Sequence, residues 1–323
     1  MEKISETYPR LYHYTNEKGL HGILENQCIW ATHYKFMNDY SEIILFREKL
    51  IEFLYPSTLY FIEKLIPKYP NSKEIISAQG GLDVLVKREN KVFVDFCYNA
   101  LKLNHEIYIT SFCKENADEY IKKNGLLSQW RGYGGDGGFA IVFKQYKLEE
   151  MISLESKVFH YNIVFSDDVI YSDDEEKCKS ELSKSLDKIA VYQAEIFEQQ
   201  LQRKNEPLKA EDAYPSFVEC ITRYKHQGFK EEQEVRIVVI PTVLDRSYQE
   251  LAGDEYCKSK LEKERKFCDK NGRSRPYIEL FRSLPIEKII VGPHKDKDSR
   301  ATALRIMLRN TDIEVTVSEI PYI

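Results

Sequence analysis

The chain has 323 residues, of which 42% are hydrophobic and 31% charged. This composition is that of a folded protein with a substantial core, and it excludes a wholly disordered chain. The formal net charge of −5 gives no overall attraction for nucleic acid or an anionic membrane. A polyanion would therefore have to be met by a local basic patch.

Seven cysteines are scattered along the sequence without a C-x-x-C pair. Their odd number and their spacing fit neither a disulfide framework nor a zinc site, so we expect reduced thiols and a cytoplasmic protein. The N-terminal residues carry no apolar leader segment. No window approaches the roughly 18 to 20 apolar residues of a membrane helix, so no membrane partner is expected.

The first part of the chain is predicted to mix short strands with helices. RLYHYT at 10–15 is typical of a strand, NEKGLHGILEN at 16–26 of a helix, and CIWATHY at 28–34 of a second strand. Apolar residues recur at helical spacing in SEIILFREKLIEFLY at 41–55. We expect Pro56 to end that helix or to lie just beyond it, because proline interrupts the hydrogen-bond ladder.

The middle of the chain changes from helical to extended character. Residues 58–104 are predicted to form two or three helical pieces. EIYITSFC at 106–113 alternates and is β-branched, and GFAIVF at 138–143 is an apolar run of strand length, so both are predicted strands. Between them, LLSQWRGYGGDGG at 126–138 ends in a glycine-rich loop that favours no regular element.

The second half of the chain continues this mixture. One or two strands are expected in 158–172, a charged helix over 173–205, and a further helix in 212–227. The remaining predicted elements are strands at 234–240, 277–281, 287–292 and 313–317 and a helix at 299–309.

The predicted order of strands and helices defines the expected fold class. Helices are inserted between groups of strands and do not alternate with them one by one, which favours α+β over a doubly wound parallel sheet. We therefore expect a single α+β domain over residues 1–323, with a mixed or antiparallel split sheet. Its helical insertions are expected near 40–105 and 173–226.

The motif LYHYT contains the first candidate site residues. In a strand, Tyr12 and Tyr14 point to one face while His13 and Thr15 point to the other. An imidazole and a hydroxyl on one face could both contact a ligand. A lone histidine, however, more often packs inside a sheet, with its ring nitrogens hydrogen-bonded to other protein groups.

Trp130, Arg131 and Tyr133 stand immediately before the glycine-rich loop. Aromatic faces beside a guanidinium suit a stacked, anionic ligand such as a nucleotide. The alternative is a helix end with an aromatic anchor. Neither a Rossmann fingerprint nor a P-loop is present, and the histidines and cysteines predict no metal site.

The stretch EEQEVRIVV sets carboxylates ahead of an apolar run. If 232–239 is extended, Glu232, Glu234 and Arg236 share one face and the valines and isoleucine take the other. This face is either the solvent-exposed side of a strand, where the ion pair has no functional role, or the functional site of the protein.

The order of several motifs resembles a bacterial domain-of-unknown-function family. The motifs are RLYHYT, IWATHYKFMND, ITSFC, LLSQWRGYGGDGGFAIVF, YKHQGFKEEQEVRIVV, RPYIELF and IEKIIVGP. More distantly, the first strand with His13, the later T-S and the E-x-E strand resemble the split-sheet core of ADP-ribosyltransferases. That second resemblance implies an ADP-ribosyltransferase-like core and NAD as substrate.

The resemblance to ADP-ribosyltransferases also implies roles for particular residues. Glu234 would hydrogen-bond the nicotinamide ribose and stabilise the oxocarbenium-like transition state, with Glu232 as the first glutamate of E-x-E and His13 holding the adenosine ribose. Arg131 or Arg236 would pair with the pyrophosphate. The implied NAD-binding residues are His13, Tyr14, Thr15, Tyr34, Ser111, Trp130, Arg131, Tyr133 and Arg236, of which Tyr34, Trp130 or Tyr133 would stack on nicotinamide.

Two functional hypotheses follow from the sequence, beside a third in which the chain is a structural protein whose helical insertions bind a partner. The first is an ADP-ribosyltransferase-like enzyme that transfers ADP-ribose to a protein or nucleic-acid acceptor, as a toxin or in phage defence, with an antitoxin or other defence partner. The second is a non-catalytic nucleotide-binding or sensing module in a defence or regulatory system. Glu234 discriminates between them, because transfer chemistry requires its carboxylate whereas ligand sensing does not.

Overall fold

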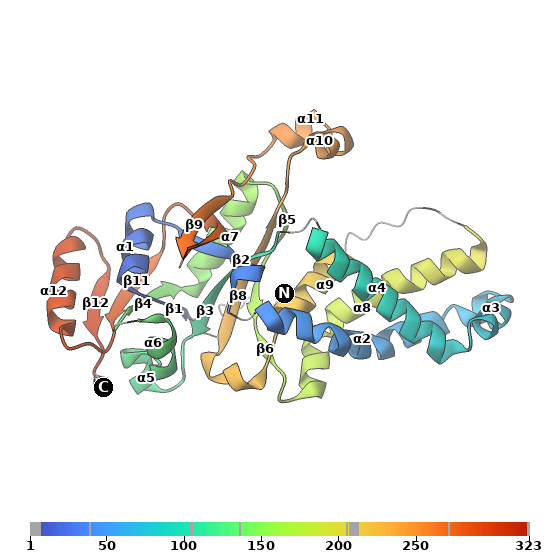
Figure 1. The fold of residues 1–323 in the computed structure, drawn as a ribbon, viewed down its shortest axis with the longest axis horizontal. Helices are drawn as coiled ribbons and strands as arrows, with labels where there is room; N and C mark the ends of the chain where they lie inside the picture. The colour runs from blue at the N-terminus through green and yellow to red at the C-terminus, as the bar shows by residue number, and fades with distance from the viewer. Residues whose placement is uncertain are drawn as a thin grey trace. The chain divides into compact units, whose positions relative to one another are not determined.

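The computed structural model describes residues 8–38, 40–103, 106–135, 137–204, 206, 213–270 and 272–321. The chain divides into two compact units (Figure 1). The first is drawn from Met1–Phe36, Ile107–Asp168 and Gly228–Ile323, and the second from Met37–Glu106 and Val169–Gln227. The fold is α+β with a mixed open sheet, as the sequence predicted.

The first unit contains a ten-stranded sheet in which every strand pair is antiparallel except β11 with β12. Along its main path the order is β12 (Glu314–Val317), β11 (Ile286–Val291), β4 (Phe139–Lys144), β1 (Arg10–Thr15), β3 (Tyr108–Lys114), β2 (Ile29–His33), β10 (Arg273–Leu280) and β9 (Lys266–Lys270). Off this path, β8 (Glu234–Pro241) pairs with β3, and β5 (Tyr161–Asp168) pairs with β8.

The sheet divides at β3. One edge of β3 pairs with β8 along its whole length. The other edge is shared, because β1 pairs near the C-terminal end of β3, with Tyr12 opposite Cys113, and β2 pairs near the N-terminal end, with Thr32 opposite Ile109. β3 therefore connects the branch β1–β4–β11–β12 to the branch β2–β10–β9.

Helices and short 3-10 turns surround this sheet. Their bounds are α1 (Glu17–Asn26), η2 (Tyr34–Phe36), α5 (Glu119–Asn124), α6 (Leu127–Tyr133), α7 (Gln145–Val158), η4 (Gln227–Glu232), α10 (Arg246–Ala252), α11 (Asp254–Lys258) and α12 (Lys297–Met307). Asn16 caps α1, its side chain accepting from Gly19 N at 2.8 Å. In Figure 1, α5 and α6 lie beside each other at one end of β1.

Both faces of the sheet around β1 and β3 are packed. We call one the Leu11 face, where Leu11, Phe112, Ile141, Val235 and Ile237 form the larger core. The opposite one is the Tyr12 face, where Tyr12, Tyr14, Cys113, Ala140 and Val142 form a smaller core. The strand period of two produces this division, since neighbouring residues of one strand point to opposite faces.

The second unit is mainly helical. It consists of α2 (Tyr40–Glu63), η3 (Ile66–Lys68), α3 (Ser72–Ala78), α4 (Leu82–Leu103), α8 (Glu175–Gln202), α9 (Ala213–Arg223) and the short strands β6 (Ile170–Tyr171) and β7 (Tyr224–Lys225). Within the described ranges, no helix combines the length and the apolar character that crossing a membrane requires.

The prediction that Pro56 ends the second helix is wrong, because α2 continues through it to Glu63. The turn of α2 that follows Pro56 packs against the helices α4 and α8. Thr58 is fully buried, and its hydroxyl contacts Asn90 of α4 and Gln193 of α8, both at 2.8 Å. Burial of this polar cluster and of Ile62 opposes the local cost of the proline.

Candidate functional site

His13 and Glu234 lie on opposite faces of the sheet. Tyr12 pairs with Cys113, and Cys113 pairs on its other side with Glu234, so these three residues form one row on the Tyr12 face. His13 follows Tyr12 in β1 and points to the Leu11 face, where its ring lies 5.6 Å from that of Phe112. The two predicted catalytic residues do not face one cleft.

Glu234 is buried and paired with Arg236. Their side chains are 5% and 2% exposed. Arg236 Nε donates to Glu234 Oε1 at 2.7 Å, and an Nη donates to Oε2 at 3.1 Å. β8 is buried along its whole length, so the interpretation of this face as the wet side of a strand is wrong. β3 and β5 pair with both edges of β8, and packing on both faces of the sheet buries its side chains.

Glu232 does not belong to the strand, contrary to the expectation that 232–239 is extended. It is the last residue of η4, and Gln233 adopts a left-handed conformation with φ of 42°. This residue interrupts the strand alternation before Glu234. The sequence rule that placed Glu232 and Glu234 on one face therefore does not apply.

A pocket opens on the Tyr12 face beside α5 and η4. It encloses about 290 Å³, including the part open to solvent. Its lining combines aromatic, thiol, amide and charged groups: Tyr12, Tyr14, Cys113, Lys114, Asn116, Ile121, Lys122, Leu126, Glu231, Glu232 and Gln233. Tyr14 and Glu232 are the two predicted site residues that line it.

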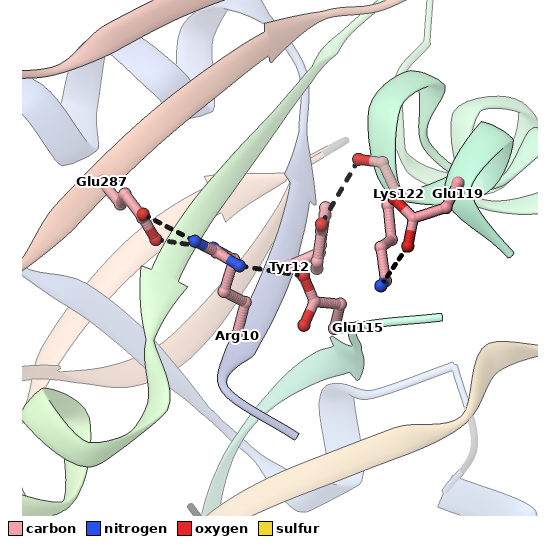
Figure 2. A network of polar contacts seen from close by, with 6 residues as sticks. All are labelled: Arg10, Tyr12, Glu115, Glu119, Lys122 and Glu287. Atoms are coloured by element: carbon pink, nitrogen blue, oxygen red, sulfur yellow. Dashed lines mark hydrogen bonds and ion pairs between the residues drawn. The ribbon is translucent and has the colours of Figure 1, made fainter. Parts of the chain in front are cut away.

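The two tyrosines are fixed by hydrogen bonds to the backbone. Tyr12 donates its hydroxyl hydrogen to the carbonyl oxygen of Lys122 at 3.3 Å (Figure 2). The hydroxyl oxygen of Tyr14 accepts from Leu126 N at 2.8 Å. Burial raises the pKa of both phenols, so both stay neutral at physiological pH.

Ion pairs lie beside the pocket, where Glu115 stands between the lining residues Lys114 and Asn116. Arg10 contacts Glu287 through Nε at 2.8 Å and through an Nη at 3.0 Å, and it contacts Glu115 at 3.2 Å (Figure 2). Lys122 Nζ lies 2.6 Å from Glu119, whose hydrogen bond raises the pKa of the lysine. With a side chain 30% exposed, Lys122 presents a cation at the pocket that remains accessible to an anionic group.

Trp130 is a packing residue of the Tyr12 face. It is 4% exposed, its ring meets that of Tyr14 edge-on at 4.8 Å, and its Nε1 donates to the carbonyl oxygen of Asn124 at 3.0 Å. A Cβ at Gly125 would lie 2.5 Å from the indole, and one at Gly292 would lie 2.8 Å away. The aromatic-anchor alternative therefore describes Trp130, and no ligand can stack on it in this arrangement.

The other predicted NAD-binding residues are dispersed. Thr15 packs on α1, where a Cβ at Gly19 would lie 2.0 Å from its hydroxyl. Tyr34 is buried in η2 after β2, whereas Arg131 and Tyr133 are exposed on α6. Ser111 lies opposite Arg236 on the Tyr12 face, and its hydroxyl oxygen is buried without a hydrogen-bond partner.

His13 is expected to make stability depend on pH. Burial lowers the pKa of its imidazole, although the Ser111 carbonyl oxygen 3.1 Å from Nδ1 opposes this. The unfolded chain, with a histidine pKa of about 6.5, then binds the proton more readily than the folded one. Stability should therefore rise with pH across the interval from the folded pKa to about 6.5, and fall as pH drops through it.

Urea unfolding of the wild type and of His13→Gln at pH 7.5 and pH 5.0 checks this expectation. The variant should lose less stability on acidification than the wild type. His21→Gln is the control, because His21 is an exposed residue of α1. An equal loss in His13→Gln and the wild type would contradict the assignment.

Among the described residues, no group of three or more histidine, cysteine, aspartate or glutamate side chains could hold a metal ion. All seven cysteines are free thiols, as the sequence predicted.

Comparisons with known proteins find a family model that matches part of the chain. Residues 129–237, about a third of the chain, match a family described as "Protein of unknown function (DUF2971)". This supports the predicted resemblance to a domain-of-unknown-function family. No curated protein and no solved structure matches. The matched range contains Glu232, Glu234 and Arg236 but not β1 or β3, which supply Tyr12 and Cys113 to the pocket.

Sequence reasoning missed most of the pocket. Tyr12, Cys113, Asn116 and Lys122 line it, and none was among the predicted site residues. The alternation in LYHYT did place Tyr12 beside Tyr14 on the face opposite His13. That signal identified the correct face, but only the strand pairing shows that Cys113 lies next to Tyr12.

Proposed function

We propose that this protein is a non-catalytic ligand-binding module whose site is the pocket on the Tyr12 face. The observation that carries this proposal is the pocket's lining, in which hydroxyl, thiol, amide and lysine groups meet beside two aromatic rings. Ligand sites typically combine apolar surface with a few fixed polar groups. Tyr12 donates to the carbonyl oxygen of Lys122 and Tyr14 accepts from Leu126 N, which fixes the two rings in this pocket.

A transferase would need His13 and Glu234 to act on one NAD molecule. Their positions on opposite faces give no support to that arrangement. The two oxygens of Glu234 already accept hydrogen bonds from Arg236, which makes the carboxylate a structural partner in a buried ion pair. Sensing of a ligand requires neither of these residues, so the second hypothesis fits the geometry better.

The proposed ligand is a nucleotide or a fragment of one. The pocket is open to solvent, and its empty space of about 290 Å³ includes that open part, so it is too small to enclose a whole dinucleotide. We expect a polar group of the ligand, such as a ribose hydroxyl or an amide, to reach into it while the rest of the ligand lies on the surface. Lys122, at the rim, would then meet a phosphate of the same ligand.

Isothermal titration calorimetry with NAD, ADP-ribose, AMP and nicotinamide tests this proposal. We expect binding of at least one phosphate-bearing ligand, and about tenfold weaker binding by Lys122→Ala, because a hydrogen bond to a charged group contributes about 1.5–3 kcal/mol. Lys123→Ala is the matched control, since Lys123 is the next residue of α5 and pairs with Glu319. Absence of binding by all four compounds, or equal weakening in both variants, would overturn the assignment.

A further inference from the structure

A second surface of the first unit carries aromatic and cationic side chains on one face of three neighbouring strands. Residues directly opposite each other in an antiparallel pair point to the same face. The register therefore places a set of residues from β2, β10 and β9 together, which we call the Trp30 face: Trp30, Thr32, Lys266, Cys268, Arg273, Arg275, Tyr277 and Glu279. Ile29, Ala31, Ile278 and Leu280 point the opposite way, into the core.

The Trp30 face presents an exposed, supported aromatic ring. Trp30 stacks on Tyr277 with ring centroids 4.0 Å apart and an angle of 27° between the rings. Tyr277 is 8% exposed and Trp30 is 42% exposed. The tyrosine therefore holds the indole from beneath, and solvent reaches the indole.

One lysine and two arginines lie along the same face. Lys266 is paired with Glu279 at 2.7 Å and lies 3.9 Å from Glu264. Arg273 and Arg275 have no carboxylate within 4.0 Å in the described part of the chain, and Arg275 Nε is buried without a hydrogen-bond partner. Arg275 stands two residues from Tyr277 in β10, about 7 Å along the strand.

We propose that the Trp30 face binds single-stranded nucleic acid. A base would stack on Trp30, while Arg273 and Arg275 would meet the phosphates that follow it. Stacking on an aromatic ring and contact with arginine are the features by which open sheet faces hold unpaired strands. The two arginines suit the phosphates of a polyanion, and because the formal net charge of −5 gives the chain no overall attraction for one, the contact has to be made by this local patch. The proposal does not depend on the Tyr12 pocket.

Fluorescence anisotropy with labelled 12-residue oligouridine and oligothymidine, on the full chain at 50 mM salt, tests this inference. We expect micromolar binding that Trp30→Ala weakens about tenfold, since base–aromatic stacking is a major term in such complexes. Arg275→Gln should weaken binding and lower the slope of log K against log salt by about 0.7. Equal binding of both oligomers indicates that the protein recognises bases and phosphates without regard to the sugar. Tighter binding of oligouridine indicates added contacts to the 2′-hydroxyl.

Phe267→Ala provides the matched control. Phe267 is a 65% exposed aromatic residue of the edge strand β9, but it lies opposite Pro276 and faces away from Trp30. The Phe267→Ala variant should bind the oligonucleotides as tightly as the wild type does. Trp30→Phe, which keeps a ring on Tyr277, should retain most of the affinity and guards against a folding defect in Trp30→Ala. Absence of binding, equal effects of Trp30→Ala and Phe267→Ala, or equal binding of duplex and single strands would overturn the proposal.

Discussion

Replacement of Glu234 by glutamine is expected to lower the free energy of unfolding by about 3 kcal/mol. Removing one member of a buried ion pair leaves the other charge without compensation, which typically costs about 3–5 kcal/mol. The amide oxygen of glutamine can still accept one hydrogen bond from Arg236, which places the effect at the lower end. Chemical denaturation followed by circular dichroism measures this loss, which is large beside a typical total stability of about 5–15 kcal/mol.

Glu231→Gln is the internal control for this experiment. Glu231 is an exposed residue of η4 and lies outside β8, so its substitution should change stability by less than about 0.5 kcal/mol. Incubation of the same proteins with labelled NAD separates structure from catalysis. The contradicting outcome is that the wild type releases nicotinamide and Glu234→Gln does not, while both are equally stable. In that case the carboxylate is catalytic and the non-enzymatic proposal fails.

The second large effect is expected at Trp130. Trp130→Ala should cost about 3–5 kcal/mol, because it removes a buried indole and leaves a cavity between Tyr14, Gly125 and Gly292. The hydrogen bond from Nε1 to the Asn124 carbonyl oxygen is lost with it. Circular dichroism during urea unfolding is the suitable measurement, since the substitution also removes one of the two tryptophan fluorophores.

Arg131→Ala tests the neighbouring position. Arg131 is exposed on α6, so its loss should leave stability within about 0.5 kcal/mol of the wild type. If a ligand stacks on Trp130 instead, NAD should change the tryptophan fluorescence of the wild type. Trp130→Ala should then lose only a little stability. That result would restore Trp130 as a binding residue.

Local sequence patterns predicted much of the fold. The apolar alternation of RLYHYT, EIYITSFC and EVRIVVI appears as β1, β3 and β8. The charged stretch 173–205 appears as α8, within a helical unit. These elements follow from periodicities that extend over a few residues, which is why sequence alone reveals them. The end predicted at Pro56 failed because packing of α2 against α4 and α8 overrides a local propensity.

The candidate site could be predicted only in part. Alternation set Tyr12 and Tyr14 opposite His13, but the E-x-E pattern was interpreted as one continuous strand, and the left-handed Gln233 breaks it. No local pattern shows that both faces of β8 are covered, so Glu234 and Arg236 could not be recognised as a buried pair. Burial of a charged side chain depends on strands that are distant in the sequence.

The sequence by itself determined the α+β class, the strands that carry the aromatic and acidic motifs, and the free state of the cysteines. Only the tertiary structure decided which residues meet. Pairing of β1 and β8 on the two edges of β3 brings Tyr12, Cys113 and Glu234 into one row and sends His13 to the other face. The physical reason is that side-chain alternation is a local property of each strand, whereas register is set by long-range pairing, and a shift of one residue would reverse every face.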